Sequence, residues 1–226
     1  MGKRLRGLLR LTVCCLCVAA CGGPKEKSIE FIYLALGASD ATGVGAVPLT
    51  EGYVYLIARE LDRQTPGVFL VNLGVPGARI DLIKEQVRVA KQLGTKADVV
   101  TLWTGANDLV NGDDPKRFQE QLRGLLGMVR KDISRMIVVG NLPDLTMLPR
   151  FRTSPNPTVT GARVDAFNRA IAEEARSAGA SLVDLHTAAV REDLVFDVDG
   201  FHPNNAGHRE LARQFLQVIL PKVHSR

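Results

Sequence analysis

The sequence predicts a three-layer α/β/α sandwich, in which helices cover both faces of a doubly wound, five-stranded parallel sheet. Two observations predict this fold class. Short apolar runs alternate with longer amphipathic stretches along the chain, which is typical of repeated strand and helix units. The runs are continuously apolar, and strands of that kind are buried on both faces, as in a parallel sheet. The hydrophobic share of 46% excludes a disordered chain.

Each predicted strand is an apolar run of five to seven residues. The strands are expected at 30–36, 68–73, 98–104, 136–141 and 181–185. The clearest helical patterns cover 78–93 and 162–179, and the last helix is expected at about 204–220. In such a sheet the functional side chains follow the carboxyl ends of the strands.

The charge of the chain is concentrated at its beginning. The net charge is +5, but four of the 29 basic residues and none of the 24 acidic ones precede residue 21, which leaves +1 for the rest. The body of the protein therefore offers no basic surface for nucleic acid. All four cysteines also lie within the first 21 residues, which excludes a disulfide framework and a cysteine-ligated metal site.

Residues 1–20 combine a basic start with an apolar run of ten residues, which predicts a secretory signal peptide. The run is too short for a membrane-spanning helix, which needs ~20 residues. Its end, Val18-Ala19-Ala20-Cys21, resembles the bacterial lipobox, and this resemblance implies lipidation of Cys21. We therefore expect an exported protein held to a bacterial membrane by this lipid, with a polar tether at 21–28 and one folded domain at 29–226. An ordinary signal peptide that happens to contain cysteines is the alternative.

Ser39 lies in a glycine-rich turn, Gly37 to Gly43, directly after the first predicted strand. The turn lacks the Lys-Ser/Thr pair of a phosphate-binding P-loop and the GxGxxG spacing of a dinucleotide site. Taken alone, Ser39 is a turn or helix-cap serine. At a strand-to-helix junction it could equally present its hydroxyl to a substrate.

Three further segments place polar groups or glycines beyond strands or near the C-terminus. Gly77 follows the second strand, and Asn107 follows the third in Gly-Ala-Asn-Asp. Near the C-terminus, Asp199 precedes His202 by three residues, close enough for the carboxylate to orient the imidazole. Each segment alone is weak evidence for a functional site, because asparagine usually caps a loop and a histidine beside a proline is usually a surface residue.

Together the four segments resemble the GDSL or SGNH hydrolases, in family order and over about residues 31–210. The resemblance implies that Ser39 is the nucleophile and that Asp199 and His202 complete a catalytic triad. It also implies an oxyanion hole formed by the Ser39 and Gly77 amides and the Asn107 side chain. One departure is visible, since the family's Gly-Asp-Ser is Gly37-Ala38-Ser39 here, which leaves the local support of the turn uncertain.

Two further residues, each close in sequence to a candidate site residue, are expected to have structural roles. Asp108 is expected to support the Asn107 loop. Asp197 and His208 are the alternative Asp-His pair for the triad, but we interpret His208 as a surface or capping residue at the start of the last helix.

No metal is expected, because the histidines form no i, i+4 pair. The triad chemistry needs no cofactor.

The predicted function is a serine ester hydrolase acting on a small-molecule, lipid or carbohydrate ester. Two alternatives stay open: an acyltransferase that passes the same acyl group to a cell-envelope sugar, and a catalytically silent binding lipoprotein. The long segment 142–157 after the fourth strand is expected to line the entrance. Its Leu, Met and Phe side chains either contact an acyl chain or pack the segment onto the domain.

Overall fold

The structure is a computed structural model that describes residues 31–188 and 190–224. The predicted signal peptide, Cys21, the tether and the first two residues of the predicted domain lie outside the described residues. None of the described helices is long and apolar enough to cross a bilayer.

The five strands form one parallel sheet in the order β2-β1-β3-β4-β5. They span Phe31–Gly37 (β1), Val68–Asn72 (β2), Val99–Trp103 (β3), Ile137–Gly140 (β4) and Ser181–Val183 (β5). The predicted fold class is confirmed, and β1 to β4 start and end within a residue of the predicted bounds.

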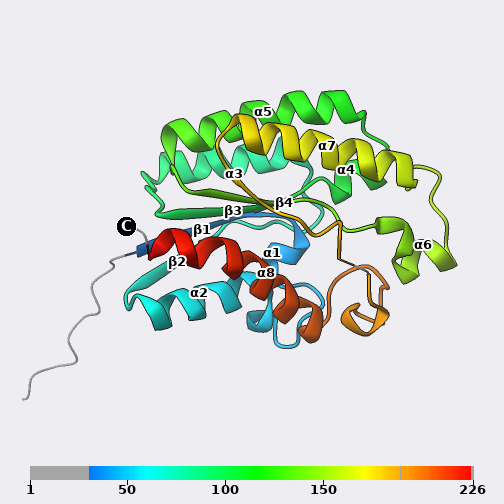
Figure 1. Cartoon of the computed structure of the whole chain (residues 1–226), viewed down its shortest axis with the longest axis horizontal. Helices are drawn as coiled ribbons and strands as arrows, with labels where there is room; N and C mark the ends of the chain where they lie inside the picture. The colour runs from blue at the N-terminus through cyan, green and yellow to red at the C-terminus, as the bar shows by residue number, and fades with distance from the viewer. Residues whose placement is uncertain (1–30, 189, 225–226) are drawn as a thin grey trace, which may run out of the picture.

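Helices cover both faces of the sheet (Figure 1). One face carries α3 (Ile80–Gln92), α5 (Pro115–Asp132) and α7 (Gly161–Ser177). The other face carries α2 (Tyr53–Gln64) and α8 (Asn205–Val223). Shorter helices occupy the connections after β1, β3 and β4: α1 (Ser39–Thr42), α4 (Ala106–Val110) and α6 (Pro149–Thr153). Three 3-10 turns span Leu49–Glu51 (η1), Leu145–Met147 (η2) and Glu192–Leu194 (η3).

Burial on both faces holds for the central strands. In β1, Leu34 and Leu36 pack into the core beneath α3, α5 and α7, whereas Tyr33 and Ala35 pack against α2 and α8. The expectation is wrong for β2, where Phe69 is 49% exposed. β2 is an edge strand with one strand neighbour, so its apolar run reflects strand propensity more than burial.

The start of α8 is fixed by Asn204, whose side-chain oxygen accepts hydrogen bonds from the amides of Ala206 and Gly207. This is an N-cap, which satisfies amides that have no partner within a helix. The helix continues to Val223, beyond the predicted end at Leu220, with Pro221 inside it. Because the cap follows directly on the segment that contains His202, it also fixes where that segment ends.

Candidate active site

The structure brings Ser39, Asp199 and His202 together at the carboxyl edge of the sheet. Ser39 is the first residue of α1, two residues beyond β1, and it is buried. Its Oγ lies 2.8 Å from His202 Nε2, across 163 positions of the chain. His202 Nδ1 lies 2.6 Å from Asp199 Oδ2. A hydroxyl, an imidazole and a carboxylate thus form one continuous hydrogen-bonded chain.

Asp199 is held by its own loop. Its Oδ1 accepts hydrogen bonds from the backbone amides of Phe201 (2.8 Å) and His202 (3.0 Å). Partial burial alone would raise the pKa of the Asp199 carboxyl, but the His202 ring and these two amides outweigh burial and lower the pKa. Asp199 is therefore a fixed carboxylate that orients the His202 ring.

Two of the three residues predicted to supply oxyanion donors, Ser39 and Asn107, line a small cavity of about 20 Å³, roughly the space of one water molecule. Ala78 also lines it. The Asn107 Nδ2 group donates one hydrogen bond to the Ala78 carbonyl at 2.9 Å, which fixes the orientation of the amide. Gly77 does not line this cavity, although its neighbour Ala78 does. The backbone φ of Gly77 is +77°, in the left-handed region that favours glycine.

Asp108 joins the segment that contains Asn107 to α3. Its Oδ1 accepts a hydrogen bond from the Ile80 amide at 3.0 Å, which connects α4 to the start of α3. The residue is completely buried, and its Oδ2 has no hydrogen-bond partner among the described residues. Burial raises the pKa of the Asp108 carboxyl to about 6, with a smaller contribution from Asp113.

The turn before Ser39 is supported by Gln86 of α3. The buried Gln86 side chain accepts a hydrogen bond from the Gly37 amide (3.1 Å) and donates one to the Gly37 carbonyl (2.8 Å). Ala38 stands where the family has Asp, and the turn that contains it is instead held by these two bonds from α3. Nothing in the sequence signals it, since a glutamine in an amphipathic helix is normally exposed.

The expectation for His208 is wrong, because the side chain is fully buried. Its Nδ1 accepts a hydrogen bond from the Tyr53 amide (3.2 Å) and its Nε2 donates one to the Val44 carbonyl (3.0 Å). Burial lowers the pKa of the His208 imidazole, which favours the neutral form that these two bonds require. His208 therefore joins α8 to the start of α2 and to the loop after α1, and it forms no pair with Asp197.

A second connection between these loops is made by Asn205. Its Oδ1 accepts from the Val47 amide and its Nδ2 donates to the Val47 carbonyl, both at 2.8 Å. Gly45 lies so close to the next segment that a Cβ there would sit 2.1 Å from the Pro203 carbonyl oxygen. The segment after Ser39 and the segment after His202 are thus fastened to each other, a contact between distant residues that sequence patterns do not indicate.

The segment 142–157 has both of the roles considered for it. Leu145 and Leu148 line a cavity of about 330 Å³ beside the triad, whereas Phe151 is buried in the core. Met147 is half exposed. The structure adds Asp40, which follows Ser39 and lines both this cavity and the small one. Burial raises the pKa of the Asp40 carboxyl.

Among the described residues, no group of three or more His, Cys, Asp or Glu side chains is placed to hold a metal ion. His186 lies 3.4 Å from Asp165 Oδ1 through its Nε2. His224 follows the end of α8.

The chain was compared with protein-family models and with known proteins. The sequence model of the GDSL-like Lipase/Acylhydrolase family matches residues 35–210. No match was found among curated protein sequences.

Several solved structures share the fold. The esterase EstA of a Pseudoalteromonas species is 20% identical, with a TM-score of 0.67 over 87% of this chain and 100% of that one. The lipase/acylhydrolase of Enterococcus faecalis is 16% identical, with a TM-score of 0.69 over 85% and 96%. The acetyl xylan esterase Axe2 of Geobacillus stearothermophilus is 22% identical, with a TM-score of 0.61 over 84% and 95%.

Proposed function

The chain belongs to the GDSL-like lipase/acylhydrolase family and acts on esters, and we propose that it does so through an acyl-enzyme formed on Ser39. The observation that carries this mechanism is the continuous hydrogen-bonded chain from Asp199 through His202 to Ser39. A serine hydroxyl is a poor nucleophile until a base takes its proton, and the 2.8 Å contact puts His202 Nε2 in position to do so.

In the first half-reaction, Ser39 Oγ forms a bond to the ester carbonyl carbon while its proton moves to His202 Nε2. Asp199 stabilises the resulting imidazolium through its 2.6 Å contact with Nδ1. When the ester C–O bond breaks, the proton on Nε2 passes to the leaving alcohol. The acyl group stays on Ser39.

The carbonyl oxygen becomes negatively charged during both half-reactions and needs donors that are already in place. The Ser39 and Gly77 amides and the Asn107 side chain fill that role. Asn107 is suited to it because its bond to the Ala78 carbonyl leaves one N–H free at the cavity that Ser39 also lines.

Water completes the reaction. Its oxygen attacks the acyl carbon, its proton moves to His202 Nε2, and the proton returns to Ser39 as the acid leaves. An acyltransferase would place a sugar hydroxyl where this water attacks, so an assay with a sugar acceptor separates the two activities. Hydrolysis predicts free acid and no acylated sugar.

The mechanism is tested by substituting its two central residues. Ser39→Ala and His202→Ala should each lower the turnover of p-nitrophenyl acetate on the order of 10⁶-fold. Ser177→Ala and His224→Ala, at exposed positions, are the matched controls and should keep wild-type turnover. A folded Ser39 or His202 variant with more than a tenth of wild-type activity would contradict the assignment.

We also propose that the mature protein is held to a bacterial membrane by a lipid on Cys21. The support is the sequence Val18-Ala19-Ala20-Cys21 at the end of a short apolar run. One myristoyl-sized chain gives only marginal attachment, with a partition constant of ~10⁴ M⁻¹, whereas several chains hold a protein firmly. The near-neutral charge of the rest of the chain offers no electrostatic substitute.

Cys21→Ser tests the anchor. Wild-type protein should be recovered in the membrane fraction and the variant in the soluble fraction, with ester hydrolysis retained in both. Mass spectrometry of the mature N-terminus should find acyl groups on Cys21. An unmodified wild-type N-terminus would refute the anchor and leave the hydrolase mechanism untouched.

A further inference from the structure

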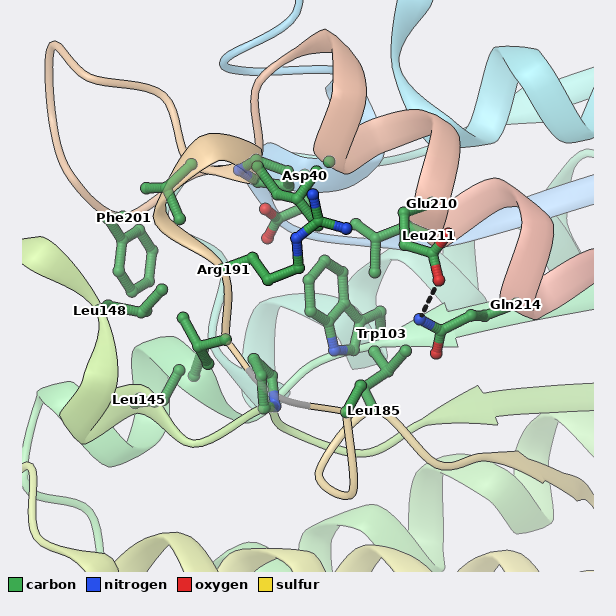
Figure 2. Close-up of a pocket in the computed structure, with 18 residues that line it drawn as sticks. Asp40, Trp103, Leu145, Leu148, Leu185, Arg191, Phe201, Glu210, Leu211 and Gln214 are labelled. Carbon is green, nitrogen blue, oxygen red and sulfur yellow. Dashed lines mark hydrogen bonds between the residues drawn. The ribbon is translucent and has the colours of Figure 1, made fainter.

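The cavity of about 330 Å³ beside the triad is not used by the mechanism (Figure 2). It lies between the carboxyl ends of β3 and β5, the segment before His202 and the first turns of α8. Four of its lining residues also line the small cavity that contains Ser39: Asp40, Trp103, Ala106 and Phe201. The two spaces therefore adjoin, and a molecule that reacts at Ser39 can extend into the larger one.

The walls of the larger cavity are mostly apolar. Leu145 and Leu148 form the side next to η2, and Leu185 and Leu211 lie on the side of β5 and α8. Trp103 lies between these groups and points into the cavity, as Figure 2 shows. Its indole nitrogen donates to the Asn141 carbonyl at 3.0 Å, so the ring is held in place and its polar atom is already satisfied.

The polar side chains of the lining are largely paired with one another or with neighbours. Gln214 donates to Glu210 at 2.9 Å, the bond drawn in Figure 2, and Glu210 also accepts from Arg213. Arg191 is paired with Asp193. Asp40 has no such partner among the described residues, and it lies where this cavity adjoins the small one that Ser39 lines. In the rest of the cavity a ligand rich in hydroxyls would find few free partners and would lose its hydrogen bonds to water, which is costly.

We propose that this cavity binds the hydrocarbon chain of the ester while the ester carbonyl lies at Ser39. The proposal rests on the hydrolase mechanism above and names its substrate class, which is a medium-chain ester. A volume of about 330 Å³ is at the lower end of small-molecule sites, which span ~300–1,000 Å³, and therefore suits one chain. The chain can come from the acyl or from the alcohol side of the ester.

Two substrate series test the proposal and separate these sources. One varies the acyl group in p-nitrophenyl esters from acetate to dodecanoate, and the other varies the alcohol from ethyl to decyl acetate. In one series kcat/KM should rise by about fourfold per methylene, the effect of burying a CH₂ group, until the cavity is full, and should then fall. If kcat/KM falls from the shortest member onward in both series, the proposal is wrong.

Substitutions of Leu211, which lines the cavity, test whether the cavity sets the preferred chain length. Leu211→Phe narrows the cavity and should lower the ratio of octanoate to acetate kcat/KM at least tenfold, or the octyl to ethyl ratio if the alcohol occupies the cavity. Leu211→Ala should move the optimum to a longer chain. Leu216→Phe, on the same helix but outside this cavity, is the control and should leave the ratio unchanged. An equal ratio in Leu211→Phe and wild type would overturn the proposal.

Binding can also be measured without catalysis, because Trp103 is the only tryptophan of the chain. Titrating Ser39→Ala protein with 1-octanol should change the Trp103 fluorescence saturably, and titrating it with glycerol should not. The absence of a saturable response refutes the cavity proposal even if esters are hydrolysed. A saturable response in Ser39→Ala protein, combined with wild-type protein that hydrolyses no ester, would support the cavity and refute the hydrolase mechanism.

Discussion

Asn205 forms hydrogen bonds with both backbone groups of Val47, each at 2.8 Å, and so fastens the loop that follows the Ser39 helix to the helix that follows His202. Ser39 and His202 come from opposite ends of the domain sequence. Their 2.8 Å separation therefore depends on contacts of this kind.

Asn205→Ala should lower kcat about tenfold with little change in KM for p-nitrophenyl acetate, because a small displacement of the reacting groups is costly in rate. The free energy of unfolding should fall by ~1–2 kcal/mol for the two lost bonds. Steady-state kinetics and urea unfolding measure both effects. Asn111→Ala, an exposed residue after α4, is the control. An equal kcat in the two variants would argue against positioning by Asn205.

Asn107→Ala should lower kcat by roughly 10²- to 10³-fold, because it removes a donor to the charged oxygen of the transition state. The lost bond to the Ala78 carbonyl should cost only ~1 kcal/mol of stability. Asn107→Asp keeps the size of the side chain without its N–H groups, so it should be about equally slow. A loss confined to KM would instead make Asn107 a substrate-positioning residue.

Gln86→Leu should destabilise the protein by ~1–3 kcal/mol, because the buried Gly37 amide loses its partner. The Gly37 carbonyl keeps a bond from the Val75 amide. Turnover should fall as well, since Gly37 is two residues from Ser39. Thermal unfolding and ester kinetics check this, with Gln92→Leu at the exposed end of α3 as the control. Equal melting temperatures for the two variants would contradict the role of Gln86.

The buried Asp108 predicts a pH dependence of stability. Its pKa is about 6 in the folded chain against a usual 3.8, so between these pH values the folded state binds more protons than the unfolded state. Stability should therefore fall as the pH rises from about 4 to about 6, by up to ~3 kcal/mol from this group.

Asp108→Asn should reduce that fall, because an amide does not titrate, while its oxygen can still accept from the Ile80 amide. Urea unfolding of both proteins at several pH values in this window gives the difference. The raised pKa of Asp40 also makes stability fall as the pH rises, but it does so in both proteins and therefore cancels in the difference between them. Parallel curves for the variant and the wild type would show that Asp108 is not the source.

The strands were predictable because a buried parallel strand is a continuous apolar run, and the candidate site because its residues follow those strands. Burial of particular side chains was harder to predict. His208 lies after a glycine at a helix start, which says nothing of the loops that fold over it. β2 is as apolar as its neighbours and became an edge strand only through the order of the sheet.

The direction of β1 sets which pole of the domain lies next to the proposed anchor. The strand begins at the edge of the sheet opposite to Ser39 (Figure 1) and advances ~23 Å over its seven residues. The ten residues from Cys21 to Phe31 can span at most roughly 35 Å. A lipid on Cys21 would thus keep the start of β1, and with it the pole of the domain opposite to Ser39, within roughly 35 Å of the bilayer. Because that reach exceeds the length of the strand, such an anchor would limit the distance of Ser39 from the membrane and leave the domain free to turn toward esters in the membrane or in the surrounding compartment.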